Sequence, residues 1–127
     1  MFKWGGTLTE TVLWNNPSPT SSYGENTISD LSITSYNYIK IRFCRGTSYT
    51  TGDASLYEVM LPIPFDLGEN KSEICGCLAA RNSSNGNYLG RRFSITSNTV
   101  WFAQAQRIAT SGSDNNSAIP LQIIGIY

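Results

Sequence analysis

The chain has 127 residues, nine basic and nine acidic side chains, and no histidine. Its length suits one domain with a single buried core, and the balance of charges gives no sign of a surface for nucleic acid or anionic membranes. The absence of histidine removes the commonest general base and the usual partner of a serine or cysteine nucleophile, which argues against a hydrolase.

Targeting segments and cysteines set further limits. No apolar stretch approaches the roughly eighteen residues of a membrane helix, and residues 1–6 lack the apolar run of a signal peptide. We therefore expect synthesis in a cytoplasm and no membrane insertion. Cys44, Cys75 and Cys77 are too few to pair completely, and we expect them to be reduced. With no histidine and no CxxC spacing, we predict no metal site and no cofactor.

In chain order, the first predicted strands are residues 11–14, 27–33 and 37–43. The third is the clearest, because Ile39, Ile41 and Phe43 alternate with three side chains that we assign to the solvated face, Tyr38, Lys40 and Arg42. Residues 56–63 form the next predicted strand, and Pro62, which cannot donate to a ladder, places it at an edge or a strand end.

The second half continues the alternation. Residues 73–81 form a strand whose two nearby thiols, Cys75 and Cys77, share one face, and Gly76 indicates a bulge or a close backbone approach. Residues 91–96 and 100–104 form a hairpin around turn-forming residues 96–99, with Phe93, Ile95, Val100 and Phe102 on the core face. The apolar residues 119–127 form the last strand.

About eight short strands with frequent turn signals predict an all-β fold. We expect a single domain, residues 1–127, with antiparallel strands in a jelly-roll-like β-sandwich. An up-and-down barrel is the alternative, which the sequence does not separate from the sandwich.

Several loop residues combine aromatic faces with amides or carboxylates, as protein–sugar contacts require. The candidate ligand-binding residues are Tyr49, Asp53, Asn85, Asn87, Tyr88, Asp114 and Asn115. The alternative for each is that it only forms a turn.

Other side chains are candidates for surface contacts. Trp14 is expected in the core, whereas Trp101 is predicted to point outward, into a subunit interface or towards a ligand. Tyr127 is a second interface candidate. Arg81, Arg91 and Arg92 are candidates for a basic patch, although outward arginines on a sheet more often pair across strands or keep it soluble.

Parts of the sequence resemble a known family. They are LWNNPSP at 13–19, TISDL at 27–31, FSIT at 93–96 followed by VWF at 100–102, and Asn116 with IPLQIIGIY at 119–127. They resemble small all-β modules at the C-terminal ends of tail-fibre and other tail-appendage proteins from phages and prophages of Gram-positive bacteria. None of these segments is a catalytic motif, and residues 47–88 show no resemblance.

The resemblance implies a virion tail protein that binds a cell-surface saccharide or wall polymer of a bacterial host, commonly as a homotrimer. We expect a non-enzymatic recognition module. The alternative is a structural capping or oligomerisation domain without a ligand, which predicts a contiguous apolar patch around Trp101 or Tyr127. A glycan-cleaving enzyme would need two carboxylates about 5–10 Å apart across a cleft, and the sequence singles out no such pair.

Overall fold

A computed structural model describes residues 8–46, 56–81, 88–107 and 114–127. These residues form eight strands and one short 3₁₀ helix, η1. The elements are β1 (Glu10–Asn15), β2 (Asn26–Ile28), η1 (Ile33–Ser35), β3 (Tyr38–Gly46), β4 (Leu56–Pro62), β5 (Ile74–Arg81), β6 (Tyr88–Ile95), β7 (Val100–Arg107) and β8 (Ser117–Ile126).

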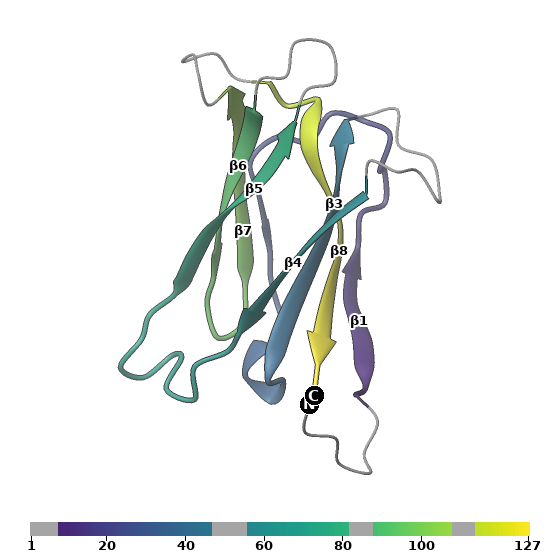
Figure 1. Cartoon of the computed structure of the whole chain (residues 1–127). Helices are drawn as coiled ribbons and strands as arrows, with labels where there is room; N and C mark the ends of the chain where they lie inside the picture. Colours follow the sequence, from purple (N-terminus) through teal and green to yellow (C-terminus); the bar gives the residue numbers. More distant parts are fainter. Residues whose placement is uncertain (1–7, 47–55, 82–87, 108–113) are drawn as a thin grey trace.

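The strands make two separate antiparallel sheets, shown side by side in Figure 1. Sheet A has the order β1-β8-β3-β4, and sheet B has the order β2-β7-β6-β5. The chain crosses between the sheets several times. Its last strand, β8, returns to sheet A and pairs with both β1 and β3. The predicted antiparallel sandwich is confirmed, and the barrel alternative is wrong because the described strands form two sheets. No helix in the described residues is long and apolar enough to cross a membrane.

The core lies between the sheets and contains the side chains that the alternation predicts. Ile39, Ile41 and Phe43 of β3 are buried, and so are the predicted hairpin residues of β6 and β7, Phe93, Ile95, Val100 and Phe102. Burial of each such side chain stabilises the fold by roughly 1.5–3 kcal/mol. The hairpin closes as predicted, with the amide of Thr96 donating to the carbonyl of Thr99 at 2.9 Å.

Gly76 marks a close approach within sheet B. It lies opposite Phe93 on the core face, and a Cβ at this position would come within 2.5 Å of the Phe93 ring. The prediction of a close approach is therefore confirmed. Cys75 and Cys77 share one face of β5, as predicted, and this is the exposed outer face of the sheet.

The predicted strand at residues 27–33 is wrong beyond residue 28. Asp30 has a φ of 60°, which turns the chain out of the strand. The amide of Leu31 then bonds the carbonyl of Asn98, and Ile33 enters the core from η1 with no exposed surface. The apolar residues of this segment thus reach the core through a turn instead of through strand alternation.

Arg91 lies inside the sandwich and not in an outward basic patch, which corrects the sequence prediction. Its side chain is fully buried. The guanidinium donates to the carbonyl oxygens of Ala118 (2.8 Å), Ala103 (2.6 Å) and Ser117 (3.1 Å), and its central carbon lies 5.2 Å from the centre of the Tyr23 ring. Arg91 therefore joins β6 and β7 of sheet B to the start of β8 in sheet A.

Local irregularities expose the carbonyls that Arg91 needs. The pairing of β6 with β7 shifts register between Arg91 and Phe93, which leaves an extra residue in β7 near Ala103. Ala118 has a φ of 48°, an unusual conformation for alanine, at the point where β8 begins. Burial lowers the pKa of Arg91 to about 10, so the side chain is charged at neutral pH.

Candidate functional site

Trp101 lies in a hollow on the outer face of sheet B. Residues that lie opposite one another in an antiparallel sheet share a face, and the register places Cys75 of β5, Ser94 of β6 and Trp101 of β7 in one row. The exposed Arg92 and Glu73 stand beside this row, and the hollow has a volume of about 410 Å³. We refer to these five side chains as the Trp101 hollow.

The Trp101 hollow combines an aromatic ring with hydrogen-bonding groups of several kinds. Trp101 is half-buried, and its indole offers an apolar surface and one N–H donor. Ser94 adds a hydroxyl, Glu73 a carboxylate and Arg92 a guanidinium. A hydrogen bond with Glu73 raises the pKa of the Cys75 thiol, so this thiol is protonated at neutral pH. The arrangement suits a small ligand with one apolar face and several hydroxyls.

Sequence reasoning found Trp101 and the outward direction of Arg92, but it missed Glu73 and Ser94 as their neighbours. Alternation within a strand gives the face of each residue, whereas the register between strands decides which residues meet. The hairpin link at residues 96–99 fixes the β6–β7 register, so Ser94 opposite Trp101 was within reach of the sequence. The pairing of β5 with β6, which places Glu73 beside Trp101, could not be predicted from the sequence.

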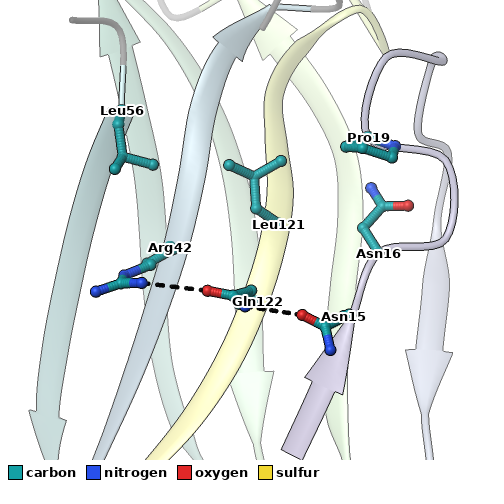
Figure 2. Close-up of a pocket in the computed structure, with 7 residues that line it drawn as sticks. All are labelled: Asn15, Asn16, Pro19, Arg42, Leu56, Leu121 and Gln122. Atoms are coloured by element: carbon teal, nitrogen blue, oxygen red, sulfur yellow. Dashed lines mark hydrogen bonds between the residues drawn. The ribbon is translucent and has the colours of Figure 1, made fainter. Parts of the chain in front are cut away.

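A second hollow, of about 330 Å³, lies on the outer face of sheet A (Figure 2). Three of its polar side chains belong to a row across the four strands. In this row Arg42 bonds Gln122 (3.3 Å) and, outside the hollow, Glu58 of β4 (2.6 Å), and Gln122 bonds Asn15 (2.8 Å). Leu56, Leu121 and Pro19 line the same hollow. Most of these polar groups bond one another, so the row serves chiefly to hold the sheet together.

A third hollow is apolar and also lies on sheet A. It measures about 740 Å³, and its lining contains no charged side chain. We call it, with the side chains that line it, the apolar surface: Leu8, Asn37, Tyr38, Met60, Pro62, Ile63, Ile126 and Tyr127. Tyr127, predicted as an interface residue, is 55% exposed here, and its ring centre lies 5.2 Å from that of Tyr36.

The structure describes only some of the loop residues that were predicted to bind a ligand. Tyr49, Asp53, Asn85 and Asn87 lie outside the described residues. Tyr88 begins β6 and is 56% exposed, but it does not line any of the three hollows.

Asp114 and Asn115 form the turn before β8. The carboxylate of Asp114 accepts from the amide of Asn116 at 3.3 Å, and the side-chain oxygen of Asn115 accepts from the amide of Ala105 at 3.2 Å. The Asp114 side chain thus stabilises the turn and the Asn115 side chain links the turn to β7, and a contact with a ligand stays a prediction for each.

The Trp101 hollow does not present the pair of carboxylates that a glycoside hydrolase uses. Glu73 is the one carboxylate among the residues that line it, whereas glycoside hydrolysis uses two. Among the described residues, no group of three or more acidic or cysteine side chains is placed to hold a metal ion.

Comparisons with protein-family models, with curated proteins and with solved structures each find no match to this chain. The resemblance to tail-appendage modules therefore stays a prediction from the sequence.

Proposed function

We propose that this domain is a non-enzymatic recognition module of a phage or prophage tail appendage, and that it binds a cell-surface saccharide of a bacterial host in the Trp101 hollow. The observation that supports the proposal is the combination of Trp101 with Ser94, Glu73 and Arg92 in one hollow. A pyranose has an apolar ring face and a rim of hydroxyls, and it needs both kinds of partner.

The positions of these side chains suit a preformed site. Ser94 and Trp101 come from adjacent strands joined by a tight hairpin, in which the Thr99 amide also donates to the Thr96 hydroxyl at 3.0 Å. A rigid floor reduces the ordering cost of binding. Glu73 and Arg92 carry opposite charges, so the hollow favours a neutral sugar over a polyanion. Weak contacts at single sites become effective when several copies bind one surface together.

The test is binding to a panel of bacterial surface saccharides. We expect wild type to bind one class of glycan, and Trp101→Ala to weaken that binding by about tenfold or more, since the stacking contact is lost. Gln104→Ala is the matched control, because Gln104 is exposed on the same strand but does not line the hollow. Circular dichroism checks that the variants remain folded.

Two results would overturn the proposal. One is a wild-type protein that binds no saccharide in the panel. The other is binding that Trp101→Ala leaves unchanged. If Tyr88→Ala weakens binding and Trp101→Ala does not, the ligand site belongs at the predicted loops instead of the hollow.

A structural capping or oligomerisation domain without a ligand is the second candidate function. The apolar surface favours it, because this alternative predicts a contiguous apolar patch around Tyr127 or Trp101. It predicts a protein that is oligomeric in solution and binds no saccharide in the panel.

A further inference from the structure

The two charged side chains of the Trp101 hollow lie at its opposite ends. The central row of the hollow contains Cys75, Ser94 and Trp101. Glu73 lies two residues before Cys75, and Arg92 lies two residues before Ser94. Because β5 and β6 are antiparallel, these two steps lead in opposite directions from the row. The hollow therefore has a negative end and a positive end, with the aromatic ring and the hydroxyl between them.

The two charged groups do not pair with each other. Arg92 lies opposite Cys77, and Cys77 lies four residues beyond Glu73, which corresponds to about 13 Å along the strand. Among the described residues, neither Glu73 nor Arg92 takes part in an ion pair. The carboxylate of Glu73 accepts a hydrogen bond from the Cys75 thiol, which holds it towards the row. Both charges thus face the hollow without a partner of opposite sign.

Each end of the hollow suits a different ionic group of a ligand. A guanidinium is planar and presents parallel N–H donors, which match the two oxygens of a carboxylate. A carboxylate only accepts hydrogen bonds, and an ammonium group is the strongest donor that a sugar carries. A polyanion is repelled at the Glu73 end and a polycation at the Arg92 end. A ligand with one charge of each sign meets an opposite charge at both ends.

We propose that the Trp101 hollow selects a zwitterionic saccharide, with a carboxylate at the Arg92 end and an ammonium group at the Glu73 end. This inference rests on the proposed function and names the class of saccharide that the same site binds. Such a ligand has no net charge, which agrees with the preference against a polyanion. The two ends are farther apart than the width of one pyranose ring, so the two charges belong to neighbouring sugars of a glycan.

The test uses four disaccharides that differ at their two ionic groups. Glucuronic acid linked to glucosamine carries both charges. Its N-acetylated form lacks the ammonium group, the form with glucose in place of glucuronic acid lacks the carboxylate, and glucose linked to N-acetylglucosamine lacks both. We expect the first to bind most tightly, and the loss of either charge to raise the dissociation constant about threefold or more. Titrations followed by the NMR signal of the Trp101 indole N–H measure these constants.

Two variants assign each charge of the ligand to its partner. Arg92→Gln should abolish the effect of the carboxylate and keep that of the ammonium group, whereas Glu73→Gln should do the reverse. Both residues are exposed, so the fold is retained. Arg81→Gln is the matched control, because Arg81 is exposed at the end of β5 but does not line the hollow. This control should bind all four disaccharides like wild type.

The outcomes separate this inference from the proposed function. Equal binding of the four disaccharides overturns the selection of a zwitterion, and so do charge effects that survive both substitutions. A protein that binds only uncharged glycans of the panel also overturns it, although the domain would remain a saccharide-binding module. A protein that binds no saccharide at all overturns the proposed function as well.

Discussion

Arg91 and Arg92 are neighbours in β6, but they lie on opposite faces of sheet B and in opposite environments. On the inner side, Arg91 is fully buried, and its guanidinium donates hydrogen bonds to three backbone carbonyl oxygens. On the outer side, the exposed side chain of Arg92 makes no hydrogen bond or ion pair with another described residue and lines the same hollow as Trp101. No buried side-chain nitrogen or oxygen of the described residues lacks a partner. The buried arginine thus serves the fold, whereas the guanidinium of Arg92 at the Trp101 hollow is available to a ligand.

The largest expected effect tests this contrast between the two arginines. Arg91→Met should lower the free energy of unfolding by about 3–5 kcal/mol, because it leaves three buried carbonyls without their donor. Arg92→Met, one residue along the same strand, should change it by less than about 0.5 kcal/mol. Unfolding of the two variants in urea measures the difference. Equal losses would show that Arg91 is not the inter-sheet connection that we describe.

A smaller effect concerns the ion pair on the outer face of sheet A. The hydrogen bond from Lys40, 2.7 Å long, lowers the pKa of Glu10. Because the folded pKa lies below the unfolded one, the stabilisation is present above the ordinary pKa of 4.5 and is lost as the pH falls through the folded pKa.

The comparison of wild type with Glu10→Gln measures this contribution. Wild type should be slightly more stable at neutral pH, and the difference in free energy of unfolding should vanish in acid. Glu10 is solvent-exposed, so added salt should also reduce the difference. A difference that stays constant from neutral pH to acid would mean that the pair does not contribute through charge.

Much of the fold follows from local alternation. The core faces of β3, β6 and β7 and the shared face of Cys75 and Cys77 were predicted from spacing alone. The buried position of Arg91, by contrast, was not predicted. It lies two residues before Phe93, so its spacing placed it on the core face, but an arginine on a strand was expected to point outward. The carbonyls that accept its hydrogen bonds lie at residues 103, 117 and 118, far along the chain, and no local pattern indicates them.

The candidate sites depend on sheet order, which the sequence did not supply. The apolar segment 119–127 was recognised as a strand, but its place between β1 and β3 decides that Ile124 and Ile126 form an outer face. Likewise, Trp101 was predicted to point outward, whereas the neighbouring Glu73 depends on the pairing of β5 with β6. Lys40 was assigned to the solvated face, yet it is only 9% exposed, because its long stem lies among apolar neighbours.

The most direct test of the central claim is the rate at which iodoacetamide alkylates Cys75 relative to Cys77, with and without the saccharide that the panel identifies. Both thiols are exposed on the same face of β5, but Cys75 lines the Trp101 hollow and Cys77 does not. We predict that the saccharide slows the alkylation of Cys75 several-fold and leaves that of Cys77 unchanged. Equal rates at Cys75 with and without a saturating saccharide would contradict binding in the Trp101 hollow.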